Sequence, residues 1–217
     1  MKNTSRTYLA VALAFLVCGV SSAQQPVTPQ SLKQAEAEVP QLAELLELKP
    51  GMTAADVGAG FGATTIVLSR WLGTAGRLYA TDIGAKQLAA LRDAVVAERL
   101  ANVLVVEGHA TSTNLPEACC DALFLRDVYH HILRPDAFNE SLLRTVKPGG
   151  RLAIIDFEPK PGSDVPDGVA ANRGGHGIRP DLVVSELTAA GFTHVRTIAA
   201  WPPDRTSGNL FLVLFRK

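Results

Sequence analysis

Closely spaced glycines and two aspartates form the chemically most informative pattern of this 217-residue sequence: Asp56-Val57-Gly58-Ala59-Gly60-Phe61-Gly62, followed by Asp82. Gly58, Gly60 and Gly62 carry no Cβ, so a backbone built from them turns sharply and lets a ligand approach closely. A carboxylate at the end of the next strand, as at Asp82, accepts hydrogen bonds from ribose hydroxyls. A tight turn with no ligand is the simpler hypothesis, but the positions of both features favour a nucleotide-type ligand.

The elements that must position these residues alternate between short apolar strands and amphipathic helices. Strands are predicted near 53–58, 77–82, 102–107, 121–126 and 151–156, and helices near 63–72, 85–99, 136–146 and 180–190. This alternation predicts an α/β fold, doubly wound, with a mostly parallel sheet covered by helices on both faces. Residues 193–200 and 209–215 are two strand-like runs without a helix between them, which predicts a C-terminal antiparallel strand pair. An earlier helix is expected over Ser31–Leu48, with Ser31 as its N-cap and a kink or break at Pro40.

Two stretches resemble the class I S-adenosylmethionine-dependent methyltransferase family: Leu48–Gly62, and Leu142–Leu152 with its Lys-Pro-Gly-Gly turn. The resemblance covers about residues 40–217 and implies a seven-stranded sheet and S-adenosyl-L-methionine as cofactor. It also implies that Asp82 binds the ribose, that Asp56 helps to hold the methionine end, and that the amides of the glycine turn face the ligand. Many members have an acid near the adenine amine where this chain has His109, so a histidine nitrogen or a main-chain group is expected to take the place of that acid.

A dinucleotide pattern also fits the turn, because G-x-G-x-x-G/A can be laid over Gly58, Gly60 and Ala63. The glycines alone therefore do not exclude an NAD-dependent oxidoreductase. The turn at 147–150 and the closing strand pair disfavour it, since a dinucleotide dehydrogenase would continue a parallel second half.

The acceptor side is predicted at the end of the fourth strand, in Asp127-Val128-Tyr129-His130-His131. Similar Asp-x-x-His-His segments follow the fourth strand in many relatives of the implied fold. Methyl transfer from a sulfonium needs mainly positioning, and a base only where the acceptor must lose a proton. Asp127, Tyr129 and His130 are the catalytic candidates, with His130 as the candidate base, because histidine takes a proton near neutral pH. In the structural alternative, one histidine donates to a backbone carbonyl and caps the next helix.

The segment 158–180 is rich in Gly, Pro and Asp, and it carries Arg173 and His176. It is predicted either to close over the acceptor or to be a surface excursion. A metal site that combines histidines with an acid lacks any pair with a diagnostic ligand spacing, so no metal is predicted. Cys119 and Cys120 precede an apolar run. Burial as small hydrophobic residues and a redox or thiophilic-metal role both stay open.

The N-terminus predicts an exported protein. Lys2 and Arg6 precede an apolar run, and small residues follow at Ser21 and Ala23, as in a cleaved signal peptide over residues 1–23. The expected organisation is this signal peptide, a linker over 24–30 and one domain over 31–217. The expected location is the periplasm or the medium, with no stable membrane span after cleavage. The alternatives are an uncleaved marginal anchor and the N-terminal hydrophobic helix of a cytosolic protein.

The charge composition argues against a nucleic-acid partner. The chain balances 21 basic against 21 acidic residues and has no basic run interleaved with aromatics. The leading hypothesis is therefore an exported methyltransferase that acts on a small-molecule acceptor. The alternative is a non-catalytic module with the same fold that binds a nucleoside-like ligand or a partner protein. This alternative arises because S-adenosylmethionine is made in the cytosol, so an exported enzyme would need a supply of the cofactor outside.

Overall fold

The computed structural model describes residues 27–160, 162, 176–202 and 209–217. The predicted signal peptide, the first part of the linker and Arg173 lie outside the described residues. Within these ranges the helices are α1 (Pro29–Leu45), α2 (Ala63–Leu72), α3 (Ala85–Ala97), α4 (Pro135–Thr145) and α5 (Pro180–Ala189), with a 3₁₀ turn η1 (Tyr129–His131). The strands are β1 (Thr53–Val57), β2 (Arg77–Asp82), β3 (Val103–Glu107), β4 (Cys120–Arg126), β5 (Val146–Phe157), β6 (Thr193–Trp201) and β7 (Leu210–Arg216). No helix in the described part of the chain combines the length and the apolar character needed to cross a membrane.

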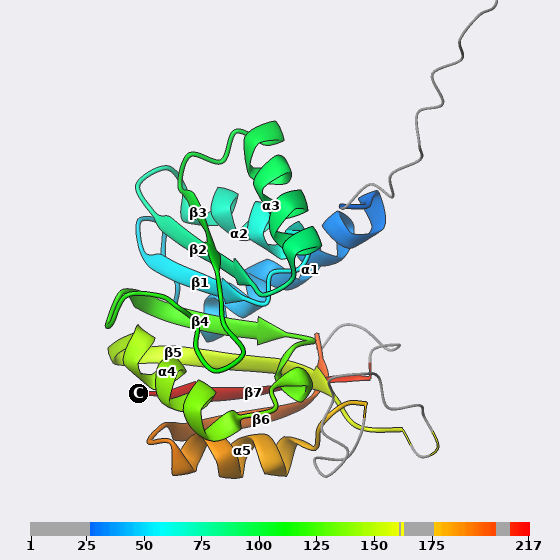
Figure 1. Cartoon of the computed structure of the whole chain (residues 1–217), viewed down its shortest axis with the longest axis vertical. Coiled ribbons are helices and arrows are strands. Elements are labelled where there is room, and N and C mark those ends of the chain that lie inside the picture. The colour runs from blue at the N-terminus through cyan, green and yellow to red at the C-terminus, as the bar shows by residue number, and fades with distance from the viewer. Residues whose placement is uncertain (1–26, 161, 163–175, 203–208) are drawn as a thin grey trace, which may run out of the picture.

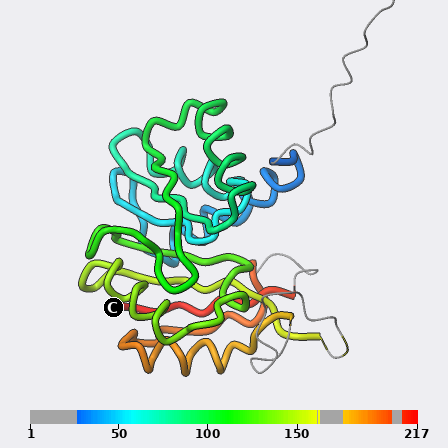
Figure 2. The backbone as a smooth tube through the Cα atoms, viewed as in Figure 1, coloured from blue at the N-terminus to red at the C-terminus, as the bar shows by residue number. Residues whose placement is uncertain are grey.

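The strands form one seven-stranded sheet in the order β3-β2-β1-β4-β5-β7-β6 (Figure 1). The pairs from β3 to β5 are parallel, and β7 runs antiparallel to both β5 and β6. The predicted fold class, including the closing antiparallel pair, is confirmed. The first half of the chain builds one half of the sheet and the second half builds the other (Figure 2). The winding therefore reverses between β1 and β4, and in such sheets ligands bind at this position.

Helices cover both faces of the sheet, and the alternation of side chains along β4 shows how. Leu123 and Leu125 lie in one apolar cluster with residues of α4 and α5. Ala122 and Phe124 point the other way, into a cluster with residues of α1 and α2. Because successive side chains of a strand point to opposite faces, a strand buried on both sides must be apolar throughout. Both faces of the sheet are therefore covered at its centre, where β4 lies beside β1.

Helix α1 and strand β5 differ most from the sequence-based expectation. Helix α1 starts earlier, because the Thr28 hydroxyl accepts from the Ser31 amide and the Ser31 side chain accepts from the Thr28 amide, so Thr28 rather than Ser31 is the N-cap. The helix also continues through Pro40, so the alternative of a break there is wrong, whereas a kink at Pro40 stays a prediction. Val39, Leu42 and Ala43 are buried against the sheet around the proline. Tertiary packing of this face holds the helix together despite the missing amide.

Strand β5 begins at Val146 instead of near residue 151, so it includes the Pro-Gly-Gly turn. Val146 pairs with Cys120, and the register then shifts so that Arg151 pairs with Ala122. A bulge of this kind adds residues to one strand without ending the pairing.

Candidate cofactor and acceptor site

A cavity of about 860 Å³ opens at the carboxyl ends of β1, β2 and β4, where the winding of the sheet reverses. Its volume lies within the range of small-molecule and cofactor pockets. All the predicted cofactor residues line it, namely Asp56, Gly58, Gly60, Gly62, Asp82 and His109. Of the predicted catalytic residues Asp127 lines the cavity, whereas Tyr129 and His130 are buried outside its lining.

The glycine turn between β1 and α2 requires glycine for two separate reasons. Gly58 has φ +79°, and a Cβ there would lie 2.4 Å from Val128 Cγ2, so the turn packs directly against the segment after β4. Gly60 has φ +57° and no atom within 4 Å of an added Cβ. A left-handed backbone is strained for most side chains. Glycine therefore places no side chain in the turn, and the backbone at Gly60 faces open space at the position where a ligand is expected.

Asp82 at the end of β2 connects this turn to the next strand. Its Oδ2 accepts the Gly60 amide and its Oδ1 accepts the Gly84 amide, each at 2.9 Å. A carboxylate has about four acceptor sites. After these two hydrogen bonds Asp82 can still accept from a pair of hydroxyls. Ile83 beside it lines the cavity with 66% of its surface exposed, and such an apolar side chain suits the flat face of a base. These residues fit a nucleoside.

Asp56 at the end of β1 is buried and accepts a 2.7 Å hydrogen bond from the Thr65 hydroxyl. Burial raises the pKa of Asp56 from 3.8 to about 7, and the nearby Asp82 carboxylate adds to the rise. A cationic group placed against Asp56 would favour its ionised form. The ammonium of the methionine moiety is such a group, so Asp56 fits the expected cofactor.

His109 after β3 is exposed, lines the cavity, and pairs with Ser112 through main-chain hydrogen bonds in both directions. These two hydrogen bonds fix the main chain of the turn. This position is compatible with the expected contact to a base, which stays a prediction.

Asp127 immediately after β4 adopts a left-handed backbone with φ +60°, and its amide donates to the Ile155 carbonyl at 2.9 Å. Aspartate tolerates this region better than most residues. Desolvation raises the pKa of the Asp127 carboxyl, and Asp156 raises it further. Backbone strain and shifted carboxyls are typical of functional sites.

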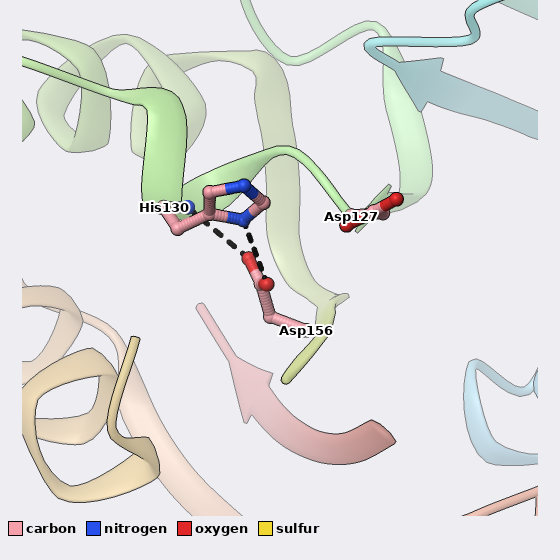
Figure 3. Close-up of side chains that lie close together, drawn as sticks. All are labelled: Asp127, His130 and Asp156. Carbon is pink, nitrogen blue, oxygen red and sulfur yellow. Dashed lines mark hydrogen bonds and ion pairs between the residues drawn. The ribbon is translucent and has the colours of Figure 1, made fainter. Parts of the chain in front are cut away.

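His130 lies behind this position and forms a buried pair with Asp156 of β5 (Figure 3). Its Nδ1 lies 2.8 Å from Asp156 Oδ1, and its main-chain amide donates to Oδ2 at 3.1 Å. Oδ1 also accepts the Phe157 amide at 2.9 Å. Since a carboxylate only accepts, the proton of the neutral ring lies on Nδ1 and Nε2 keeps its lone pair. Nε2 is buried and finds no hydrogen-bond partner among the described residues.

Ligand atoms of Asp127, His130 and Asp156 lie within 4.8 Å of one another, a grouping that could also hold a cation. Three N–H groups already occupy the Asp156 carboxylate. These three contacts favour a hydrogen-bonded His130–Asp156 pair over a metal site.

Tyr129 is buried beside the expected acceptor site but does not line the cavity. Its hydroxyl donates to Glu186 of α5 at 2.9 Å and accepts from Asn139 of α4 at 2.7 Å. The side chain is fully buried and lies outside the cavity lining. These contacts support a structural role in joining η1 to α4 and α5, and the catalytic role expected from the sequence stays a prediction.

The sequence analysis did not single out two residues that the structure brings to the acceptor side. His131 is exposed and lines the cavity, with its ring centroid 4.0 Å from that of His130. Desolvation, with the neighbouring His130, lowers the pKa of His131. Asp156 is the buried partner of His130. The sequence indicated that Asp156 ends a predicted strand, but it did not indicate that Asp156 pairs with His130. His176 of the 158–180 segment lies edge-on to His130, with ring centroids 5.4 Å apart.

Comparison with known proteins agrees with this geometry. The sequence family described as "Methyltransferase domain" matches residues 55–154. A ubiquinone/menaquinone biosynthesis C-methyltransferase from Pseudomonas paraeruginosa is 30% identical over 123 residues, which cover 56% of this chain and 48% of that protein. This chain spans about half the length of the curated relatives it matches.

Among solved structures, a SAM-dependent methyltransferase from Aquifex aeolicus has a TM-score of 0.69 at 26% identity, covering 88% of this chain and 98% of that one. The [4+2]-cyclase SpnF has a TM-score of 0.66 at 18% identity, covering 86% of this chain and 81% of that one, a likeness of fold alone. The matched domain, the sheet and the similar methyltransferases agree: residues 55–154 form a methyltransferase domain of the class I S-adenosylmethionine-dependent kind, and these findings support S-adenosylmethionine as its cofactor.

Proposed function

We propose that the protein transfers a methyl group from S-adenosylmethionine to a small-molecule acceptor. One observation carries the proposal: a single cavity joins the glycine turn and Asp82 to Asp127 at the end of β4. The cofactor supplies an activated methyl group on a positive sulfur. The protein must then hold the acceptor in line and keep water away, because positioning supplies most of the catalysis of such a displacement.

The cofactor contacts divide between two strand ends. Asp82 holds the ribose hydroxyls while it fixes the glycine turn through Gly60 and Gly84. Asp56 holds the methionine end, where its buried carboxylate faces Thr65 and the end of β1. The base lies against Ile83 and His109.

The acceptor side has an apolar wall. Val128, Ile132, Leu133 and Phe138 line the cavity beyond the end of β4, and Leu133 is 54% exposed. This wall supports an acceptor with an apolar body. The curated relatives are named for ubiquinone and menaquinone biosynthesis, so aromatic precursors of quinones belong in the first acceptor panel.

Proton removal is assigned to the His130–Asp156 pair, with Nε2 as the accepting atom. An unpartnered buried nitrogen costs stability unless something satisfies it, and a hydroxyl, thiol or acidic C–H of the acceptor would do so. His130 is 1% exposed, so its cover must shift when the acceptor binds. The rings of His131 and His176 are part of that cover.

The experiment is a screen for transfer of a labelled methyl group from S-adenosylmethionine to a panel of phenolic, thiol and quinone-precursor acceptors. The expected result is a labelled product and a stoichiometric amount of S-adenosylhomocysteine with at least one acceptor. Tight binding of both cofactor forms without turnover on any acceptor would instead support a non-catalytic binding module. The fold alone does not decide between these outcomes, since one architecture can carry different functions, and the [4+2]-cyclase SpnF has a similar one.

The affinity for S-adenosylhomocysteine should rise between pH 5.5 and pH 7.5 because Asp56 must ionise to attract the ammonium group. With its pKa raised to about 7 by burial, Asp56 is neutral at the acid end of this range, and affinity should gain up to about tenfold per pH unit below the pKa. The Asp82 carboxylate also raises the pKa of Asp56, and the Arg126 guanidinium lowers it. Calorimetric titrations across the range measure the effect. Asp56→Asn should bind more weakly and without this slope, and the same slope in the variant would assign the titration to another group.

Export is part of the proposal, carried by the N-terminal charge and apolar pattern of residues 1–23. The mature protein should begin at Gln24 and should be recovered from the periplasm or the medium. N-terminal sequencing of the native protein measures this. Soluble cytosolic protein beginning at Met1 or Lys2 would overturn it.

A further inference from the structure

Cys119 and Cys120 lie at the start of β4, at the opposite end of that strand from Asp127. The strand β4, Cys120–Arg126, has seven residues and spans roughly 20 Å at about 3.3 Å per residue. The methyl-transfer site therefore does not use these cysteines. Their two Sγ atoms lie 2.6 Å apart, so both side chains point to the same side of the chain. Side chains of adjacent residues in a regular strand point to opposite faces, so the backbone departs from regular strand geometry here.

We propose that Cys119 and Cys120 form a redox-active dithiol that closes to a disulfide between adjacent residues by exchange with a small-molecule disulfide. The surroundings separate the two sulfurs into different roles. Cys119 is half-buried, whereas Cys120 is fully buried in the apolar cluster beneath α4 and α5. Only Cys119 is placed to meet an oxidant from solution, and Cys120 needs only to reach its neighbour.

Charge supports the same division. The contact with Cys120 lowers the pKa of the Cys119 thiol, and the Lys147 ammonium contributes in the same direction. The contact with Cys119 and burial both raise the pKa of the Cys120 thiol. The thiolate is the attacking species in disulfide exchange, so Cys119 is the nucleophile and Cys120 resolves.

The exchange balances in two steps. The Cys119 thiolate attacks one sulfur of R–S–S–R, an S–S bond to Cys119 forms, and one R–S⁻ leaves. Once Cys119 is neutral, the neighbouring thiol no longer faces a negative sulfur, so Cys120 can release its proton to solvent. The Cys120 thiolate then attacks the Cys119 sulfur and expels the second R–S⁻. The protein loses two electrons and two protons, and the small-molecule disulfide R–S–S–R becomes two R–SH thiols.

The closed form should be easily reduced. Adjacent Cα atoms are about 3.8 Å apart across a trans peptide, less than the roughly 4.4–6.8 Å usual for a disulfide. A ring outside this range stores strain and is more reducible. The burial of Cys120 argues against a shared thiophilic metal as the alternative, because a bridging ion needs access to both sulfurs.

The test uses the full chain and oxidised glutathione. After quenching with N-ethylmaleimide, tryptic digestion yields the peptide Leu100–Arg126, which contains these two cysteines and no other. The expected oxidised peptide has lost the mass of two hydrogens and carries no maleimide, and reduced glutathione should restore two maleimide sites. Cys120→Ser should trap a glutathione adduct on Cys119. Cys119→Ser should leave Cys120 at least about tenfold slower to react, as burial of a protonated thiol requires.

Two results would overturn the proposal. One is a wild-type peptide that accumulates glutathione on Cys119, or keeps two maleimide sites, under excess oxidised glutathione. The other is protection of both thiols without loss of two hydrogens, reversed by a chelator, which would show a bound thiophilic metal. Binding of S-adenosylhomocysteine, measured on the same samples, tests the cofactor site separately. Both cysteine variants should retain it because the pair lies at the far end of β4.

Discussion

Replacing His130 by alanine will lower the rate of methyl transfer by about 10²–10⁴-fold, the usual contribution of a positioned general base. The affinity for S-adenosylhomocysteine should change little, because β1 and β2 supply the cofactor contacts and His130 lies beyond β4. The physical reason is the geometry of the pair: Asp156 holds Nδ1–H at 2.8 Å and leaves Nε2 as the accepting nitrogen. The measurement is single-turnover methyl transfer with an acceptor found in the screen, beside calorimetry with S-adenosylhomocysteine.

Three further variants make this prediction discriminating. Asp156→Asn keeps the shape of the side chain but removes the carboxylate that fixes the ring, so it should lower turnover in the same direction as His130→Ala. His131→Ala tests the neighbouring ring, which lines the cavity but lacks the buried carboxylate partner. His194→Ala, on the exposed surface of β6, is the matched control and should be neutral. If His131→Ala abolishes turnover and His130→Ala does not, the base is His131 and the buried pair is structural.

Replacing Asp82 by alanine should weaken S-adenosylhomocysteine binding by at least about tenfold, because a hydrogen bond to a charged group contributes roughly 1.5–3 kcal/mol. The ribose loses its acceptor, and the glycine turn loses its connections to Gly60 and Gly84. Calorimetry gives the affinity, and thermal unfolding without ligand shows whether the fold survives.

The conservative variant Asp82→Asn keeps one acceptor oxygen and should lose less affinity than Asp82→Ala. Asp93→Ala removes an exposed carboxylate of α3 outside the cavity lining and should change nothing. Unchanged affinity in Asp82→Ala with an intact fold would remove Asp82 from the site.

The sequence predicted most of the fold because its strands are short apolar runs bounded by glycine turns and separated by helical periodicity. The bounds of α2 and β2 agree with the expected ones. The start of α1 was predicted wrongly because Ser31, expected as the cap, is the inner member of a capping box that begins at Thr28. The early start of β5 was missed because it depends on pairing with Cys120 across a bulge, a non-local interaction without a sequence signature.

The cofactor side of the site was predictable for a topological reason. Parallel strands that follow one another bring their carboxyl ends to one edge, so Asp56, the glycines and Asp82 had to lie together. The acceptor side was less predictable. Which of two adjacent histidines faces the cavity depends on the short turn η1, and the partner of His130 comes from β5, 26 residues later. The placement of Tyr129 depends on contacts with α4 and α5 that the sequence pattern does not encode.

The central claim is that the cavity at the ends of β1, β2 and β4 binds S-adenosylmethionine. Calorimetric titration of the protein with S-adenosylhomocysteine, S-adenosylmethionine and NAD tests it most directly. The expected result is saturable binding of both sulfur nucleosides with one site per chain, weakened by Asp82→Ala, and no binding of NAD. Saturable binding of NAD in their place, or no binding of either sulfur nucleoside by folded protein, would contradict the account.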